Sequence, residues 1–228
     1  YRARRQRQMC IRDSYDVVII GGGGHGLAAA HYLANEHGIT DVAVLEQRYI
    51  GHGGTGRNTS IIRSNYLTEE GAKFYQFSVD LYRDLSRQLD FNLFYSQRGH
   101  FTLAHSPASL RTQRWRAEVN KHLGIDSEVV GPDFVQKTIP QIDLTCGGHQ
   151  PPILGALYHP PGAIARHDAV AWAYARGADS KGVEIHQRTA VTGIEVADGA
   201  VMGVHTDRGF IKTSKVLSAV AGWTPRIQ

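Results

Sequence analysis

The stretch YDVVIIGGGGHG, residues 15–26, decides the fold of this chain. Its first half is apolar and β-branched and runs into glycines, which predicts a short buried strand. The Ala-rich segment 27–37 follows with helical spacing and ends at Gly38, and DVAVLE, residues 41–46, predicts a second buried strand. Strand, helix and strand make a βαβ unit, so we predict an α/β fold with a Rossmann-type parallel sheet.

The glycine run matches the pattern G-x-G-x-x-G at Gly21, Gly23 and Gly26. In this pattern the first glycine allows a tight turn, the second lets a pyrophosphate approach the backbone, and the third lets the helix pack on the strand. The N–H groups and dipole of the helix start then hold the phosphates. We therefore predict a dinucleotide site that also includes Gly24 and His25, with the His25 ring either near the cofactor or packed against the following loop.

An acidic residue, Glu46, ends the second strand, 20 residues beyond Gly26. An acid at this position accepts a hydrogen bond from a ribose 2′-OH and repels a 2′-phosphate, so NADP is disfavoured. NAD and FAD both remain compatible with the βαβ unit alone.

Three further features favour FAD, bound non-covalently. A Gly-rich loop, GHGGTGRNTS, covers residues 51–60; strands 191–197 and 201–206 alternate around Asp198-Gly199 and a third follows at 210–213; and AVAGWTP, residues 219–225, follows a last buried strand. FAD proteins of this kind fold such a loop over the cofactor and carry such a meander in place of a crossover helix. The additional contacts predicted from these segments are Arg57, Asn58, Thr59, Ile62, Val191 and Gly222.

The predicted domains alternate along the chain. We assign 15–95 and 155–228 to a discontinuous FAD-binding domain that is incomplete at its C-terminal end, and 96–154 to part of an α+β substrate or cap domain. A helix from about Thr68 should bury an apolar stripe that includes Phe74 and Phe77. Asp168 is the expected N-cap of a helix that runs to about Ser180.

Composition narrows the class of protein. The formal net charge of +4 arises within residues 1–14, which hold five arginines and one acid; the remaining residues have equal numbers of basic and acidic side chains. A basic arm could bind nucleic acid or an acidic membrane. We instead predict that residues 1–14 are a disordered or non-native tail, and we expect no nucleic-acid or membrane partner. Two isolated cysteines, Cys10 and Cys146, predict no disulfide framework and no metal site, and they favour a cytoplasmic setting.

These residues carry a family resemblance. The chain is similar to the D-amino-acid-oxidase-like superfamily of FAD oxidoreductases, and within it the resemblance is strongest to β subunits of heterotetrameric sarcosine oxidases. The most specific segment is GRNTSIIRSNYL, and the resemblance covers nearly all of 15–225. The matching stretches are YDVVIIGGGGHGLAAAHYLANEHGITDVAVLE, TGRNTSIIRSNYL, SQRG, LAH and ARHDAVAWAYARGAD.

The resemblance implies a reaction and a second cofactor. FAD would oxidise the C–N bond of sarcosine or a similar small amino acid, electrons would pass to an FMN held covalently by His167, and O₂ would be reduced, in a complex with other subunits. It also implies a role for Arg63 near the flavin or the substrate carboxylate; a structural salt bridge is the alternative. A related amine or imino-acid dehydrogenase without covalent FMN, like dimethylglycine dehydrogenase or glycine oxidase, stays open.

Members of this family continue well past the equivalent of Gln228, so the resemblance implies an N-terminal fragment. We therefore expect the strand around Phe101–Ala104 to lack its partner strands and the fragment to fold poorly alone.

Overall fold

The computed structural model describes residues 11–148 and 151–227, which form two compact units. Unit 1 contains the chain up to Thr59, Leu89–Leu93 and the chain from Arg166 onward; unit 2 contains Ser60–Gln88 and Phe94–Ala165. The boundaries of these units differ from the predicted domains, because the stretches 60–88 and 155–165 pack within unit 2. Within the described residues, no helix has the length and apolar character needed to cross a membrane.

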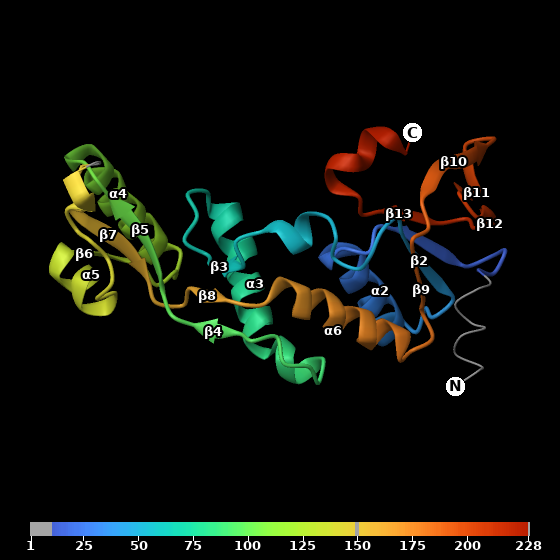
Figure 1. Ribbon diagram of the computed structural model, residues 1–228, viewed down its shortest axis with the longest axis horizontal. Helices are drawn as coiled ribbons and strands as arrows, with labels where there is room; N and C mark the ends of the chain where they lie inside the picture. Colours follow the sequence, from blue (N-terminus) through green and yellow to red (C-terminus); the bar gives the residue numbers. More distant parts are fainter. Residues whose placement is uncertain (1–10, 149–150, 228) are drawn as a thin grey trace. The chain divides into compact units, whose positions relative to one another are not determined.

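Unit 1 is built on a four-stranded parallel sheet (Figure 1). The strand order is β13-β1-β2-β9, so the first strand lies inside the sheet. The strands are β1 (Val17–Ile20), β2 (Val42–Glu46), β9 (Glu184–Gln187) and β13 (Val216–Ser218). Helices α2 (Gly24–His37) and α6 (His167–Asp179) lie side by side in this unit. The sheet and its helices confirm the predicted α/β class.

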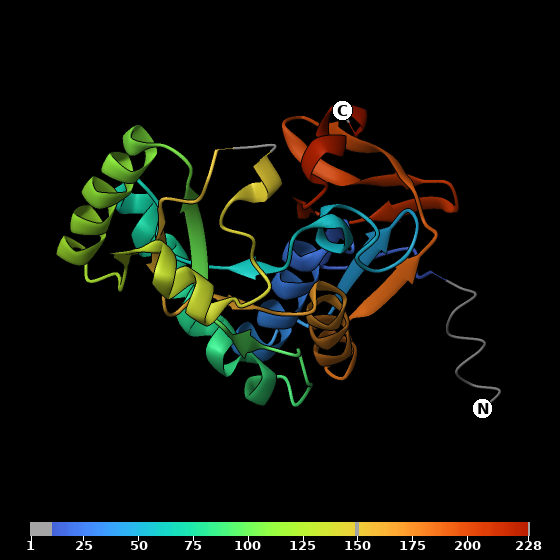
Figure 2. The same ribbon diagram turned by 60° about the vertical axis from the view of Figure 1, so that its left-hand side comes forward.

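The two faces of the sheet are covered by different elements. Val18, Ile20 and Leu45 form one apolar cluster with Val204 and Ile211 of a three-stranded antiparallel meander (Figure 2). On the other face, Ile19 lies beneath the first turn of α2. Every residue of β1 and β2 is buried because both faces of the sheet are covered. Burial on both faces explains why each strand is a continuous apolar run.

The meander consists of β10 (Val191–Ala197), β11 (Ala200–Thr206) and β12 (Gly209–Lys212). Ala197 pairs with Ala200 across a two-residue turn in which Asp198 and Gly199 have φ of +52° and +76°. Two positive φ values characterise a type I′ hairpin turn, which the sequence Asp-Gly predicts.

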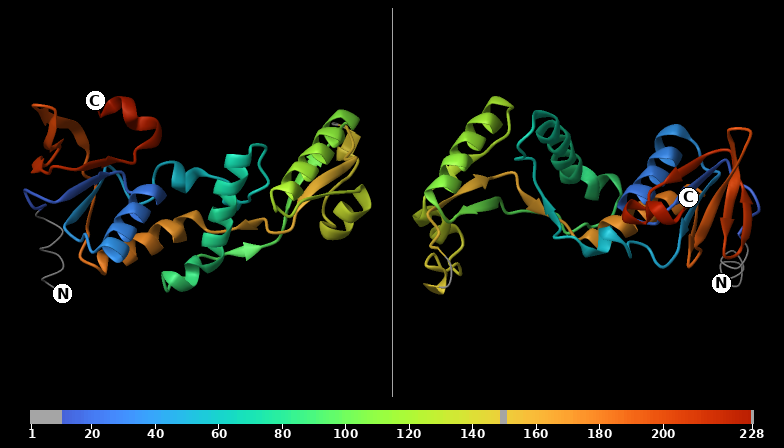
Figure 3. Two further views of the ribbon diagram at one scale, coloured as in Figure 1. Left: turned by 180° about the vertical axis from the view of Figure 1, so that it is seen from behind. Right: turned by 90° about the horizontal axis from the view of Figure 1, so that it is seen from above.

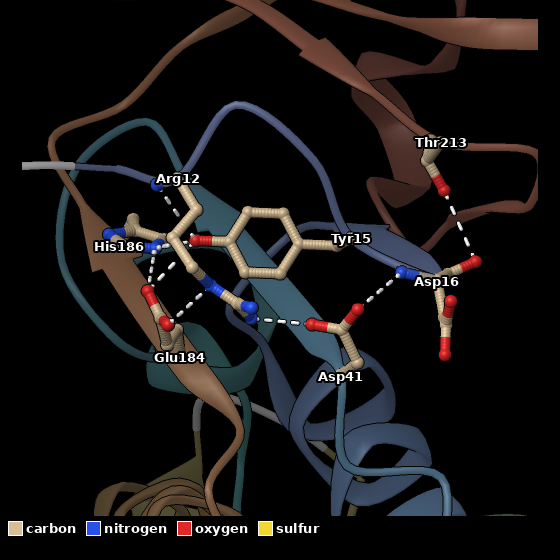
Figure 4. Close-up of polar contacts among 7 residues, drawn as sticks. All are labelled: Arg12, Tyr15, Asp16, Asp41, Glu184, His186 and Thr213. Atoms are coloured by element: carbon tan, nitrogen blue, oxygen red, sulfur yellow. Dashed lines mark hydrogen bonds and ion pairs between the residues drawn. The ribbon is translucent and has the colours of Figure 1, made fainter.

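Residues 11–14 belong to the fold of unit 1, contrary to the prediction that the whole of 1–14 lies outside it. Arg12 Nη2 lies 2.5 Å from Asp41 Oδ1 and Arg12 Nε lies 2.8 Å from Glu184 Oε1 (Figure 4). The Tyr15 hydroxyl donates to Glu184 Oε2 at 2.8 Å and lies 3.0 Å from Nε2 of His186. These ion pairs and hydrogen bonds hold the segment before β1, an effect that charge counting along the sequence does not reveal. The remainder of the predicted tail lies outside the described residues.

The start of α6 corrects a second expectation. Arg166, rather than Asp168, is the N-cap residue, and it forms no side-chain capping bond to the helix. Asp168 lies in the first turn, where its carboxylate accepts two hydrogen bonds from the Arg166 guanidinium at 3.0 and 2.7 Å. Arg166, two residues earlier, thus binds the carboxylate that the sequence predicts as the cap.

Unit 2 combines three helices with two small antiparallel sheets. One sheet has the order β5-β7-β6 and the other β3-β8-β4, and α4 packs along the first (Figure 3). The strands are β3 (Ile61–Ile62), β4 (Ser96–Gln97), β5 (His100–Ala104), β6 (Glu128–Val130), β7 (Gly155–His159) and β8 (Ala163–Ile164). The helices are α3 (Glu69–Gln88), α4 (Pro107–His122) and α5 (Pro132–Thr138).

Two expectations for unit 2 need correction. The strand at Phe101–Ala104 has one partner, because β5 pairs with β7 along its whole length, and β5 lies at the edge of its sheet. On α3, Phe74 and Phe77 are 66% and 70% exposed, whereas Val79 and Leu85 are buried. Helical spacing predicts that α3 has an apolar face. It does not predict which apolar side chains of that face are buried in this unit.

Candidate functional site

The candidate site is a pocket of about 390 Å³ in unit 1, at the carboxyl ends of β1 and β2. This is the edge at which ligands bind open parallel sheets. The pocket brings together segments that lie far apart in the sequence: the glycine turn, the end of β2, the second loop, the start of β10 and the stretch after β13. The predicted site residues that line it are Gly21, Gly23, Gly24, His25, Glu46, Asn58 and Val191.

The glycine turn is shaped by two close backbone approaches. Gly21 has φ of +112°, and a Cβ on it would lie 2.6 Å from the carbonyl oxygen of Ala219. A Cβ on Gly26 would lie 2.0 Å from the carbonyl oxygen of Gly21. The chain can therefore turn sharply from β1 into α2, and the helix can lie against the strand, only because both side chains are absent.

The second loop is fastened over this turn. Gly51 N–H donates to the carbonyl oxygen of Gly22 at 2.8 Å. Thr55, in the 3₁₀ helix η1 (Gly54–Arg57), accepts a 2.9 Å hydrogen bond on Oγ1 from the N–H of Gly24. Both bonds hold the loop at the mouth of the pocket, and Thr55 itself lines the pocket.

Glu46 is held rigidly at the end of β2. Its carboxylate is nearly buried and accepts hydrogen bonds from Gly22 N–H at 2.9 Å and from Arg48 N–H at 2.8 Å. Each oxygen uses one lone-pair direction on the backbone and retains another. The residue also lines the pocket, so its carboxylate is a fixed acceptor at the position where a ribose hydroxyl is expected.

The residues present fit the diphosphate of a dinucleotide. Gly23, the N-cap residue of α2, and His25 have no acceptor for their backbone N–H groups in the described part of the chain. Unsatisfied N–H groups at a helix start are a ready site for phosphate oxygens. A Cβ on Gly23 would lie 3.2 Å from Thr55 Oγ1, so the turn also lacks a side chain that would fill this space.

The remaining predicted nucleotide contacts do not line this pocket. Gly26 lies beneath it, Arg57 is exposed and its Nη2 contacts His52 Nε2 at 3.0 Å, and Thr59 and Gly222 are exposed. Ile62 belongs to unit 2.

Ala219, Val220 and Trp223 belong to the segment AVAGWTP, which favours FAD in the sequence, and they line the pocket after β13. Thr55 and the buried Thr189 also line it, although neither is a predicted contact. Thr55 had a recognisable signal, since a hydroxyl in a Gly-rich loop can bond a helix N-terminus.

His167 lies apart from the lining of the nucleotide pocket. It is the first residue of α6 and is half-buried. Its Nδ1 atom is buried and has no hydrogen-bond partner among the described residues. An imidazole nitrogen without a partner is available for a bond to another group, which fits the expected attachment of a flavin without placing one.

Arg63 lies in unit 2, directly after β3. Its Nη1 donates to Asn65 Oδ1 at 2.9 Å, and its guanidinium carbon lies 4.3 Å from the centre of the Tyr66 ring. No ion pair to an acidic residue is found for Arg63 within the residues that the structure describes, so the structural salt bridge considered from the sequence is not formed here.

A glycine turn at the start of a helix, an acid after the second strand and a meander over the far face of the sheet define a dinucleotide-binding protein of the flavoprotein type. The family model described as FAD dependent oxidoreductase matches residues 16–228. The chain belongs to this family, and the resemblance predicted from its sequence is confirmed.

Relatives agree with this assignment. Sarcosine oxidase subunit beta from Rhizobium meliloti (strain 1021) is 49% identical over 95% of this chain and 51% of its own length. The same subunit from Arthrobacter sp is 47% identical over 92% of this chain and 52% of its own length. The crystal structure of L-proline dehydrogenase from P. horikoshii aligns with a TM-score of 0.86 at 27% identity, over 95% of this chain and 55% of that chain. The chain thus spans about half the length of the curated relatives it matches.

Proposed function

We propose that unit 1 binds FAD non-covalently in the pocket at the carboxyl ends of β1 and β2. The single observation that carries this proposal is the turn at Gly21–Gly26, with free N–H groups at the start of α2 and the loop of Thr55 fastened over it. The diphosphate is held by Gly23 and His25, the ribose by Glu46, and the adenine lies along the backbone at Val191. The family to which the chain belongs supports FAD as the cofactor.

The proposed reaction is the oxidation of the C–N bond of a small secondary amino acid, with sarcosine as the proposed substrate. The name sarcosine oxidase subunit beta, carried by two relatives above 45% identity, supports this substrate class. Bound FAD would supply the two-electron acceptor. The chain itself would hold and orient that cofactor through the glycine turn, and unit 2 would form part of the substrate domain, with Arg63 as a cation for the substrate carboxylate or the reduced flavin.

A second flavin is part of the proposal. We infer that His167 carries a covalent FMN that takes electrons onward to O₂, within a complex that contains other subunits. The position of His167 at the first residue of α6 supports this role, as does its buried Nδ1, which has no hydrogen-bond partner in the described part of the chain. The name of the relatives, a subunit of an oxidase, supports the hetero-oligomer.

Mass spectrometry tests the two cofactors separately. The complete protein, co-expressed with its partner subunits, should release one dissociable FAD and should carry the mass of FMN on the peptide that contains His167. His167→Asn should lose the covalent mass and retain FAD, whereas His122→Asn, at an exposed histidine of α4, should retain both.

The outcomes separate the candidate functions. FAD without any covalent flavin would reject the two-flavin oxidase and favour a related amine or imino-acid dehydrogenase. Absence of FAD from a folded protein would reject the proposal as a whole.

A further inference from the structure

Two arginines of unit 2 converge on a single buried residue. Arg63 Nη1 donates to the side-chain oxygen of Asn65 at 2.9 Å, and Arg116 Nη2, from α4, donates to the backbone carbonyl oxygen of Asn65. Asn65 is fully buried. Two cationic groups therefore lie around one neutral residue, at a point that solvent reaches poorly.

Neither cation is neutralised by this unit. Within the described residues, no aspartate or glutamate forms an ion pair with Arg63 or Arg116, although arginines elsewhere in the chain, such as Arg83 and Arg166, do form such pairs. Burial, and then the nearby charge of Arg63, lower the pKa of Arg116. Like charges that are partly removed from water repel, so this arrangement is stabilised when an anion lies between them.

Buried polar atoms near the pair also lack partners. In the part of the chain that the structure describes, Arg116 Nε, Asn65 Nδ2 and His100 Nδ1 are buried and form no hydrogen bond. More than nine in ten buried polar groups in native proteins are paired, so three unpartnered atoms in one cluster indicate a missing acceptor. Burial and the charge of Arg63 lower the pKa of His100 to about 4, so its ring adds no third charge near neutral pH.

His100 connects this cluster to an apolar hollow of about 310 Å³. The hollow is lined by side chains that include Ile61, Phe101 and Ile164, all of unit 2. A ligand that placed an anionic group at the arginines would have room for a short apolar part beside His100.

We propose that Arg63 and Arg116 form a two-guanidinium site for the carboxylate of a small organic acid, with the Asn65 amide and the His100 ring as further partners. The identification of this acid as an amino-acid substrate rests on the function proposed above. The existence of the anion site does not depend on that function. Arg116 binds the carboxylate directly and so shares this role with Arg63, although no sequence motif marks α4 for it.

Acetate binding to the complete, FAD-loaded protein tests the site. Acetate is the probe, and acetamide, which has the same shape without the charge, is the matched ligand. Charge-assisted hydrogen bonds of this kind contribute enough that Arg116→Gln should weaken acetate binding about 10- to 100-fold in calorimetry. Arg116→Lys should recover part of the affinity, because it restores the charge without the fork of donors. Arg114→Gln, at an exposed arginine of the same helix, should bind acetate as the wild type does.

Kinetics supply a second readout. Loss of a contact made equally to substrate and transition state raises KM and leaves kcat unchanged, which is the pattern expected of Arg116→Gln.

Two results would overturn the proposal. One is an acetate affinity of Arg116→Gln equal to that of the wild type. The other is that Arg116→Gln unfolds at a lower temperature and added acetate raises the unfolding temperature of both proteins equally, which would mean that Arg116 pairs with a carboxylate side chain of the complete protein. If acetate binding depends on Arg116 but no secondary amino acid is oxidised, the anion site stands and the proposed function fails.

Discussion

Gly26→Ala adds one methyl group at the tightest contact in the glycine turn. The new Cβ would lie 2.0 Å from the carbonyl oxygen of Gly21, and the obstacle is backbone, which cannot rotate away. Ordinary contact begins near 3.4 Å, so α2 must withdraw from the end of β1 by roughly 1.4 Å. The new Cβ would also lie 3.3 Å from Ile19 Cγ2, which is tighter than ordinary contact.

Overpacking of a close-packed interior costs about 1–3 kcal/mol, so the free energy of unfolding should fall by this amount. For unfolding units of this size, the unfolding temperature should drop by about 2–12 °C. The withdrawal also moves the N–H groups of Gly23 and His25 from the phosphate position, so FAD should bind more weakly. Thermal unfolding with and without added FAD, together with flavin retention on gel filtration, measures both effects.

Gly24→Ala is the matched control, two residues earlier on the same helix. Its Cβ would meet the Thr55 side chain at ordinary contact distances, 3.5 Å from Oγ1 and 3.8 Å from Cγ2, and alanine has the higher helix propensity. The apoprotein of this variant should be as stable as the wild type or more so. If Gly26→Ala unfolds at the same temperature as Gly24→Ala, the close approach of helix and strand does not set the stability of the turn, and the reasoning is refuted.

Two further substitutions probe unit 1. Glu46→Gln leaves one acceptor for the two N–H groups of Gly22 and Arg48, so the free energy of unfolding of the apoprotein should fall by about 1–3 kcal/mol; an unchanged denaturation midpoint would contradict this. Burial and the bond to Glu184 raise the pKa of Tyr15 from 10.0 to about 12. Its contribution to stability is therefore complete below pH 10 and is lost as pH rises towards 12. Tyr15→Phe should reduce the fall in the free energy of unfolding between pH 10 and pH 12. An identical pH dependence in the variant and the wild type would rule out the effect.

Local signals in the sequence predict most of unit 1. A glycine turn, an Asp-Gly hairpin and continuous apolar strands each specify their structure through nearby residues. Contacts between segments that lie far apart in the sequence are harder to predict. Arg12 binds Glu184 across a separation along the chain that no local pattern spans, so the sequence does not predict that residues 11–14 join the fold of unit 1.

Periodicity has a similar limit on α3. It identifies which residues share an apolar face but not what covers them, and Phe74 and Phe77 are exposed in spite of their spacing. Asp168 shows the same limit for a cap: its type and position suit an N-cap, yet Arg166 is the N-cap residue and its guanidinium donates two hydrogen bonds to the Asp168 carboxylate.

The donors of the glycine turn fall into two groups. The N–H of Gly22 donates to Glu46 and that of Gly24 to Thr55, so the protein satisfies these itself. The N–H groups of Gly23 and His25 have no acceptor among the described residues, so a ligand could accept hydrogen bonds from them. The sequence motif marks glycines by steric need and does not distinguish these groups. The structure does, because Glu46 and Thr55 come from segments that the motif does not include. A phosphate can therefore meet a turn that is already fixed, and little of its binding energy is needed to order the loop.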